Sequence, residues 1–430
     1  MPGPRKVLII GGGFAGLACA QKLANDSRFA VTLIDRRNHH LFQPLLYQVA
    51  TASLAAPDIA RSLRGVLSSA ANVTVLLDDI TTIDCDTRLA RSADNSYPFD
   101  SLVLATGART SFFGKDDWAT HTVGLKSLED AQTIRRRVLT GLERAECSAD
   151  PDERRRLMTV VIVGGGPTGV ELAGAFSDLV RRALKADFRR INPADLRILL
   201  VQSDDRILKS FQPDLSDYAR QRLEELGVEI CLEARVDEVE SGRVHLDTGR
   251  WIEAATIIWA AGVQASDLTA CLPGERDRGG RLLVSPDLSI PGHPDLFAAG
   301  DIVSVPGPDG EPVPGLAPAA SQMGRHIAAV LREDQRLATT RYARRKSEFR
   351  AAFRYRDKGI MAIIGKNCAV AQAGRLKMRG ILAWAAWLFI HLLFLIGFRN
   401  KLAVLLQWGW AYLVDKPGAR VITGHDDKVA

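Results

Sequence analysis

Three glycines near the start of the chain constrain its fold more than any other feature. Gly11, Gly13 and Gly16 form a G-x-G-x-x-G pattern, directly after the apolar stretch 6–10 and directly before a helical apolar stripe. A second apolar stretch, 30–34, leads into Asp35. A strand, a tight glycine turn, a helix and an acidic strand end, in this order, are typical of a βαβ site for a dinucleotide.

Each part of this turn has its own expected role. Gly11 permits the tight turn, Gly13 lets the backbone approach a pyrophosphate, and Gly16 lets the helix and strand pack closely. The free N–H groups and dipole of the helix N-terminus favour phosphates. Asp35 can accept hydrogen bonds from a ribose diol. We therefore expect cofactor binding by Gly11, Gly12, Gly13, Phe14, Ala15, Gly16, Asp35 and Arg36.

The glycine pattern occurs twice. Residues 160–169 repeat residues 7–16 at an offset of 153 positions, and residues 257–263 repeat residues 102–108 at an offset of 155. Two matched pairs at nearly the same offset indicate two Rossmann-like domains, the second inserted in the first. The second phosphate turn consists of Gly164, Gly166 and Gly169.

The second site differs from the first at its strand end. The apolar stretch 196–201 leads into Gln202, where the first site has Asp35. A carboxylate would favour a free ribose 2′-hydroxyl and repel a 2′-phosphate, whereas glutamine does neither strongly. The choice between NADH and NADPH therefore stays open, with Arg206 a candidate for contact with a phosphate. The long interval between Gly169 and Gln202 predicts a lengthened basic helix.

The composition of the chain argues against several kinds of site and partner. The six cysteines are scattered without a C-x-x-C pair, which argues against a disulfide framework, a zinc site and a redox-active dithiol. His39 and His40 lack a further ligand at suitable spacing, so we expect no metal. The net charge is +6, and residues 341–379 alone contain twelve Lys/Arg against two Asp/Glu. Because an apolar tail follows this basic block, it favours an anionic membrane surface over nucleic acid.

The C-terminal region is unlike the rest of the chain. Alternation predicts strands at 349–353, 361–364 and 369–371, followed by the apolar runs 381–398 and 402–414. The length of the first run makes it a candidate transmembrane helix, but its tryptophans and flanking cations suit the headgroup region. Spanning the membrane, lying on it and forming a buried hairpin all stay open. The predicted fold class is therefore α/β, with two Rossmann-like dinucleotide-binding domains plus a C-terminal membrane-associating α+β region.

These motifs together resemble the type II NADH dehydrogenases, which are single-subunit, non-proton-pumping NADH:quinone oxidoreductases. The resemblance covers essentially the whole chain. The nucleotide motifs are shared across the superfamily of flavoproteins with two dinucleotide-binding domains, whereas two features are far more specific. They are the segment 40–50 and the Trp-rich tail. The resemblance also rests on the two glycine turns and on the segments 104–107, 299–301, 317–324 and 357–359.

The resemblance implies roles for individual residues. Further FAD-binding residues are Gln48, Ile80, Thr106, Gly107, Gly300, Asp301 and Ala317. Gly262 and Gln202 join the second glycine turn in holding NADH. Glu171 resembles a carboxylate near the nicotinamide and quinone that is proposed to take part in proton transfer. The catalytic set is Glu171, Gln322 and Lys358.

The implied activity is respiratory: hydride passes from NADH or NADPH to FAD, and two electrons pass to a membrane quinone without proton pumping. Three alternatives are weighed against it. A ferredoxin reductase would not need the apolar tail. A sulfide:quinone oxidoreductase needs paired cysteines near its flavin. A nucleotide-sensing membrane protein would oxidise NADH slowly or not at all.

The resemblance also implies an organisation and partners. We expect an FAD-binding domain at 1–120 and 281–335, an NAD(P)H-binding domain at 121–280 and a membrane-anchoring domain at 336–430. The expected partners are a membrane quinone, an anionic membrane surface contacted through 375–414, and a second copy in a homodimer. The expected location is the cytoplasmic face of the cell inner membrane, as a peripheral or monotopic protein.

Overall fold

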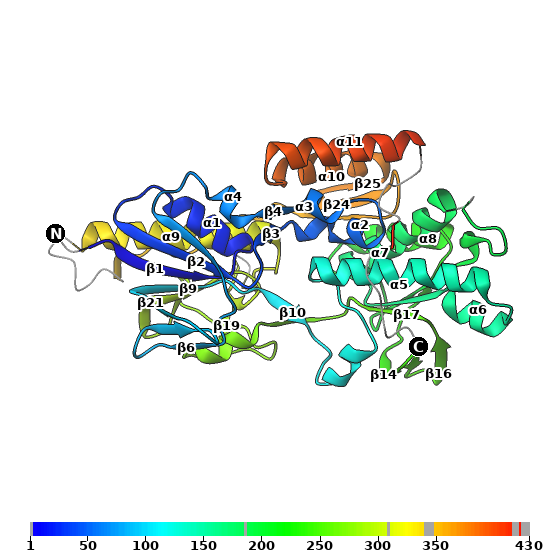
Figure 1. Ribbon diagram of the computed structural model, residues 1–430, viewed down its shortest axis with the longest axis horizontal. Helices are drawn as coiled ribbons and strands as arrows, with labels where there is room; N and C mark the ends of the chain where they lie inside the picture. Colours follow the sequence, from blue (N-terminus) through cyan, green and yellow to red (C-terminus); the bar gives the residue numbers. More distant parts are fainter. Residues whose placement is uncertain (1–2, 185–186, 308–309, 339–347, 415–420, 423–430) are drawn as a thin grey trace. The chain divides into compact units, whose positions relative to one another are not determined.

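The chain forms two compact units, each built around its own parallel sheet (Figure 1). The computed structural model describes residues 3–184, 187–307, 310–338, 348–414 and 421–422. Unit 1 comprises Met1–Leu41, Ala60–Arg109 and Val263–Lys358. Unit 2 comprises Phe42–Ile59, Thr110–Gly262 and Gly359–Ala430. The predicted region 336–430 therefore divides between the units, and part of it (339–347, 415–420 and 423–430) lies outside the described residues.

A six-stranded sheet of order β20-β21-β9-β1-β2-β5 forms the centre of unit 1. Its strands are parallel except for the pair β20 and β21. The inner strands read as continuous apolar runs because both faces of the sheet are covered. The strands are β1 (Arg5–Ile10), β2 (Phe29–Asp35), β5 (Val73–Leu77), β9 (Ser101–Leu104), β20 (Ser289–Ile290) and β21 (His293–Ala298).

Two helices of unit 1, α1 (Phe14–Leu23) and α9 (Ala317–Leu337), lie side by side against this sheet (Figure 1). They cross closely, since a Cβ on Gly324 would lie 2.0 Å from the carbonyl oxygen of Ala15. The remaining elements of unit 1 are short. They are β3 (His39–Leu41), β4 (Ala60–Ser62), α4 (Leu63–Val66), β6 (Thr82–Asp84), β7 (Leu89–Arg91), β8 (Ser96–Pro98), η5 (Asp267–Cys271), β19 (Leu282–Leu283) and β22 (Val303–Ser304).

Unit 2 contains the second parallel sheet, of order β13-β12-β11-β17. Its core packs the apolar side chains of this sheet against those of an antiparallel sheet, β14-β15-β16. The strands are β11 (Thr159–Val163), β12 (Arg197–Val201), β13 (Val228–Cys231), β14 (Val236–Glu240), β15 (Arg243–Leu246), β16 (Arg250–Glu253) and β17 (Thr256–Trp259). Strands β10 (Ala108–Thr110) and β18 (Val263–Ala265) pair where the chain enters and leaves this unit.

Helices surround the second sheet. α5 starts with a capping box in which Ser127 and Asp130 bind each other's backbone N–H groups. The helices are η1 (Gln43–Leu45), α2 (Leu46–Ala50), α3 (Ala56–Ile59), η2 (Asp116–Thr120), α5 (Leu128–Cys147), α6 (Pro151–Leu157), α7 (Pro167–Asp178), the π-turn η3 (Leu179–Ala183), η4 (Pro193–Asp195) and α8 (Pro213–Glu225).

The prediction of a lengthened basic helix after Gly169 is confirmed only in part, because the helix does not fill the interval up to Gln202. Helix α7 ends at Asp178 and continues only through the π-turn η3. A loop follows, in which the carboxylate of Glu146 accepts the backbone N–H groups of residues 189–191 at 2.9–3.0 Å. Because the loop backbone finds its hydrogen-bond partners in this carboxylate, it does not need to be helical.

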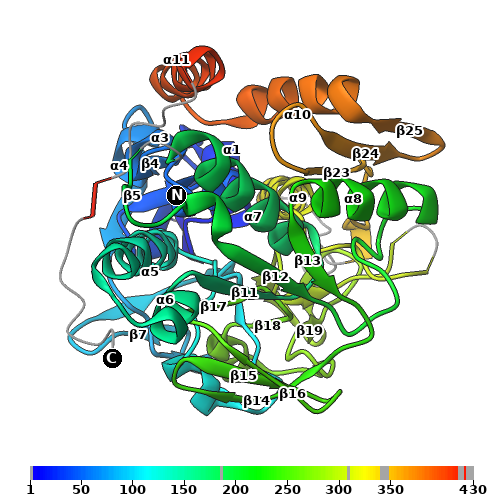
Figure 2. The ribbon, with the colours of Figure 1, turned by 90° about the vertical axis from the view of Figure 1, so that its right-hand side faces the viewer.

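The C-terminal part of unit 2 is a small antiparallel sheet followed by two helices. The sheet comprises β23 (Ile360–Ile363), β24 (Ala369–Ala373) and β25 (Leu376–Arg379). Helix α10 (Gly380–Phe394) packs on this sheet, and α11 (Phe398–Val414) follows it (Figure 2). The strands predicted at 361–364 and 369–371 are confirmed, whereas residues 349–353 form no strand because the side chain of Arg350 turns into a buried ion cluster.

The apolar run 381–398 is not one helix. Helix α10 ends at Phe394 and α11 begins at Phe398, with Gly397 between them at a φ of +88°. Helix α10 ends where Leu395 takes an extended conformation, with a ψ of +135°. Within the described ranges, none of the helices is both long enough and apolar enough to cross a membrane.

Candidate functional site

The first glycine turn joins β1 to α1 at the carboxyl edge of the unit 1 sheet. Gly11 has a φ of +105°, and a Cβ there would lie 2.3 Å from the carbonyl oxygen of Ala105. A Cβ on Gly16 would lie 1.9 Å from the carbonyl oxygen of Gly11. Around Gly13, in contrast, nothing lies within 4 Å of the Cβ position. Only glycine fits at positions 11 and 16, and the backbone at Gly13 is open to a ligand.

Asp35 holds the strand end against this turn. One carboxylate oxygen accepts the N–H of Gly12 at 2.6 Å, and the other accepts the N–H of Arg37 at 2.7 Å. The ring Nδ1 of His40 lies 3.1 Å from the carbonyl oxygen of Gly12. The acid is therefore fixed beside the turn, as a dinucleotide site requires. The neighbouring Arg36 is exposed.

Other predicted residues lie at the ends of neighbouring strands of the same sheet. Thr106 and Gly107 follow β9, and Gly300 and Asp301 follow β21. Within the described part of the chain, the buried hydroxyl of Thr106 has no hydrogen-bond partner. No side chain caps the N-terminus of α9, which begins at Ala317. An unpaired buried hydroxyl and an uncapped helix N-terminus fit the phosphates and polar chain of FAD. Ile80, another predicted FAD-binding residue, is buried in the segment that follows β5.

The side-chain amide of Gln322 forms two hydrogen bonds within unit 1. Its Oε1 accepts the backbone N–H of Arg356 at 3.0 Å, and its Nε2 donates to the carbonyl oxygen of the same residue at 3.1 Å. This pair of bonds fixes the chain two residues before Lys358, whose side chain is exposed. Gln322 is therefore placed to position the segment that carries Lys358.

The second glycine turn has the geometry of the first. Gly164 has a φ of +109°, and a Cβ there would lie 2.7 Å from the backbone nitrogen of Ala261. A Cβ on Gly169 would lie 2.0 Å from the carbonyl oxygen of Gly164. The Cβ position of Gly166 is again open. Further along, Gly262 has a φ of +79°, and a Cβ there would meet the ring of Phe113 at 2.5 Å.

Gln202 makes the same turn contact as Asp35. Its Oε1 accepts the N–H of Gly165 at 2.7 Å, as Asp35 accepts that of Gly12. Its Nε2 donates to a carboxylate oxygen of Asp204 at 2.7 Å, and Lys209 pairs with the other oxygen. The second site thus lacks an acid at the strand end but holds one two residues later.

Glu171 lies just after the first turn of α7 and is partly buried. Burial raises its pKa to about 8, although the N–H of Ile363 and the indole of Trp387 act to lower it. The N–H of Ile363 donates to its Oε1 at 3.4 Å. The indole N–H of Trp387 contributes to lowering the pKa of this carboxyl group, but it forms no hydrogen bond with it among the described residues. Near neutral pH this carboxyl group therefore holds a proton.

Helix α2 adds two buried polar residues to unit 2. Gln48 donates from Nε2 to the hydroxyl of Tyr47 at 2.8 Å and accepts the indole N–H of Trp408 at 2.8 Å. Burial raises the pKa of Tyr47 well above its ordinary value, and the charge of Glu171 raises it further. We name Tyr47, Gln48, Glu171, Trp387 and Trp408 the tail cluster. The sequence predicted Gln48 and Glu171 as site residues. The three aromatic members lie in the segment 40–50 and the Trp-rich tail, but the sequence assigned no role to these individual side chains.

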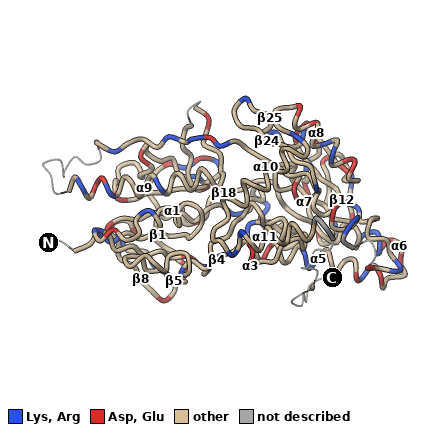
Figure 3. The backbone as a smooth tube through the Cα atoms, turned by 90° about the horizontal axis from the view of Figure 1, so that it is seen from above, with Lys and Arg blue, Asp and Glu red and all other residues tan. Residues whose placement is uncertain are grey.

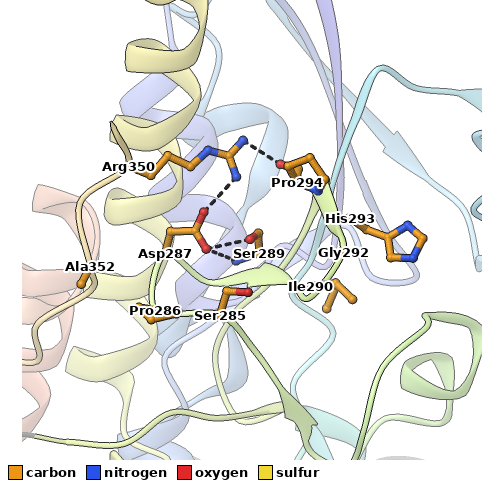
Figure 4. Close-up of a pocket in the computed structure, with 10 residues that line it drawn as sticks. All are labelled: Ser285, Pro286, Asp287, Ser289, Ile290, Gly292, His293, Pro294, Arg350 and Ala352. Carbon is orange, nitrogen blue, oxygen red and sulfur yellow. Dashed lines mark hydrogen bonds and ion pairs between the residues drawn. The ribbon is translucent and has the colours of Figure 1, made fainter. Parts of the chain in front are cut away.

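Unit 1 also has a pocket of about 420 Å³ near its sheet edge (Figure 4). The guanidinium of Arg350, whose side chain is 1% exposed, donates to Asp287, Asp334 and the carbonyl oxygen of Pro294. Because two aspartates neutralise the charge of Arg350, its guanidinium links the segments that contact it and is not available to bind an anion. None of the predicted site residues lines the pocket.

Two glycine turns of one geometry, each closed by the side chain at a strand end, define a protein with two dinucleotide sites. Residues 5–324 match the family described as pyridine nucleotide-disulphide oxidoreductase. The chain is 41% identical to the type II NADH:quinone oxidoreductase NdhA of Mycobacterium tuberculosis, over 98% of this chain and 90% of that one. The chain belongs to the type II NADH:quinone oxidoreductase family, as its motifs predicted.

Other similarities are more distant. An internal alternative NAD(P)H-ubiquinone oxidoreductase of Arabidopsis thaliana mitochondria is 28% identical, over 97% of this chain and 86% of its own. The structure of NDH2 from Plasmodium falciparum in complex with NADH has a TM-score of 0.87 at 18% identity, covering 98% of this chain and 100% of that one. The sulfide:quinone oxidoreductase of Aquifex aeolicus reaches a TM-score of 0.70 at 18% identity, with 92% of each chain covered. These two structures show the fold alone, and the predicted α/β class with two dinucleotide-binding domains is confirmed.

Proposed function

We propose that this protein is an FAD-dependent NADH:quinone oxidoreductase. The observation that carries the proposal is the pair of matching glycine turns in a chain 41% identical, over nearly its whole length, to an enzyme of that name. Two nucleotide sites in one chain suit transfer between a resident flavin and a diffusible nicotinamide. Family membership favours this activity over a ferredoxin reductase, a sulfide:quinone oxidoreductase or a nucleotide sensor.

The flavin belongs to unit 1 in this proposal. The first glycine turn and Asp35 hold its ADP half, and the hydroxyl of Thr106 gains the partner that it lacks. Gly107, Gly300, Asp301 and the N-terminus of α9 at Ala317 complete the binding of its polar chain. When bound, FAD supplies the redox chemistry, accepting a hydride and passing two electrons on.

Unit 2 supplies the nicotinamide site and a proton. The second glycine turn, Gly262 and Gln202 hold NADH, with its pyrophosphate at the N-terminus of α7. Reduction of a quinone to a quinol takes two electrons and two protons. The carboxyl of Glu171, protonated near neutral pH because of its raised pKa, can supply one of these protons. Lys358, on the unit 1 segment that Gln322 fixes, is the further residue that the family resemblance assigns to the catalytic set.

The surfaces of α10 and α11 support membrane docking. Helix α10 buries Ala383 and Trp387 but carries no Lys, Arg, Asp or Glu along its length (Figure 3). A helix that is apolar on all sides but buried along one stripe needs a further apolar medium. Exposed apolar side chains on the two helices include Ile381, Leu382, Phe389, Leu393, Phe394, Phe398, Leu402, Leu405, Leu406 and Trp410.

We propose that these helices lie on the cytoplasmic face of the cell inner membrane, where the quinone dissolves. The exposed Arg375, Arg379 and Arg399 would meet anionic headgroups. The homodimer stays a proposal that rests on the family resemblance. Flotation with anionic vesicles tests the docking, and the mass of the detergent-solubilised protein tests the dimer. Vesicles that leave the protein at the bottom of the gradient would contradict the docking.

The decisive experiment measures NADH and NADPH oxidation by the purified flavoprotein, with and without a short-chain quinone. Quinone-dependent NADH oxidation supports the proposal. A flavin that NADH reduces but quinone does not reoxidise would overturn the choice of acceptor. In sealed vesicles that contain a pH-sensitive dye, turnover should build no proton gradient.

A further inference from the structure

Helix α11 contacts the rest of unit 2 through a single stripe of side chains. The side-chain amide of Asn400 donates to the backbone oxygens of Pro57 and Asp58, at 3.0 and 2.8 Å. Val404 is fully buried, and Trp408 donates to Gln48. A spacing of four residues places all three side chains on one face of the helix. The polar bonds at both ends of this stripe therefore fix how α11 sits on the unit.

Trp408 also determines which way the amide of Gln48 faces. An indole nitrogen can only donate, so it must meet the oxygen Oε1. The nitrogen Nε2 then faces the hydroxyl of Tyr47 as a donor. The two ends of a glutamine amide have nearly the same shape, so without the indole the amide could turn round. Gln48 is only 7% exposed, and water cannot readily replace the lost bond.

This orientation leaves hydrogen-bond donors available. Nε2 carries two hydrogens, and among the described residues only Tyr47 accepts one of them. The oxygen of Tyr47 already accepts from Gln48, so its own hydrogen is directed elsewhere. Burial keeps this hydroxyl protonated. Donors of this kind suit the carbonyl oxygens of a quinone.

We infer that Trp408 is a positioning residue for the quinone: through Gln48 it keeps the amide N–H and the Tyr47 hydroxyl available as donors to a quinone carbonyl. The inference rests on the proposed function and adds a residue of the C-terminal helix to the acceptor site. Helix α11 then takes part in recognising the acceptor, besides any contact with lipid.

The test compares Trp408→Phe, Gln48→Met and the double variant, in detergent with a short-chain quinone. Losing one hydrogen bond to a buried group should raise the KM for quinone about five- to tenfold in Trp408→Phe. Binding of the same quinone to the oxidised enzyme without NADH should weaken by the same factor. In Trp408→Phe, the rate of flavin reduction by NADH and the FAD content should not change. The double variant should match Gln48→Met, because Trp408 acts through Gln48.

Trp410→Phe is the matched control, since this ring lies on the same helix and is 61% exposed. It should leave all these measurements unchanged. If Trp408→Phe leaves quinone KM and binding unchanged, or lowers both half-reactions equally, the inference is overturned. Effects of the two single variants that simply add would also overturn it. A wild-type enzyme that reduces no quinone would instead overturn the proposed function.

Discussion

At the scale of single residues, burial gives Glu171 an unusual titration. Its pKa rises from 4.5 to about 8, so the folded chain binds this proton more tightly than the unfolded chain. The contribution to stability is full below the unfolded pKa and is lost as the pH rises through about 8. We expect the denaturation midpoint of wild type to fall over this window more than that of Glu171→Gln.

The same substitution should slow quinone reduction and leave flavin reduction by NADH unchanged, because it removes a proton donor only. In wild type, quinone reduction should fall as the pH rises through about 8, and Glu171→Gln should lose this step. Glu253→Gln, at an exposed position, is the control. A variant that keeps the wild-type pH profile would remove Glu171 from the proton path.

A second residue-scale prediction concerns Asp204, which Gln202 holds at 2.7 Å. A negative charge near the adenosine ribose repels a 2′-phosphate, so we expect the enzyme to prefer NADH. Asp204→Asn should raise kcat/KM for NADPH relative to NADH about tenfold, or ~1.4 kcal/mol. Asp205→Asn, at the exposed neighbouring position, should not. Equal use of both nucleotides by wild type would contradict this prediction.

At the scale of elements, the crossing of α1 and α9 allows no side chain at Gly324. A Cβ there would lie 2.0 Å from the carbonyl oxygen of Ala15, in the helix that follows the glycine turn. Gly324→Ala should therefore push the helices apart, shift the turn and lower the FAD content. Gly409→Ala, in α11 with nothing within 4 Å, should keep full FAD content. Equal flavin content in both variants would show that the crossing adapts.

Elements were predictable from sequence where the pattern is local. The glycine turns and the strands that flank them follow from spacing alone. The bond between Gln48 and Trp408 joins residues 360 positions apart, and no local pattern reveals it. Alternation at 349–353 predicted a strand, because a local pattern cannot show that the charge of Arg350 is buried. In the structure its buried charge is balanced by Asp287 and Asp334.

At the scale of the whole molecule, the two units carry different spectroscopic probes. All seven tryptophans lie in unit 2, whereas the residues predicted to hold the ADP half of FAD lie in unit 1. Flavin release therefore reports on unit 1, and tryptophan emission reports on unit 2. Each unit has its own sheet, so thermal unfolding need not be a single transition.

Excess FAD should separate the thermal transition followed by flavin release from the one followed by tryptophan emission. A ligand at a hundred times its Kd adds about 2.7 kcal/mol to the unit that binds it, which for a unit of this size is roughly 5–10 °C in Tm. We expect the flavin-release transition to rise by this amount while the tryptophan transition stays in place. Adding NAD⁺ should raise the tryptophan transition instead. If both signals move together with FAD, the units unfold as one cooperative body, and substitutions at the first glycine turn would then destabilise the second site as well.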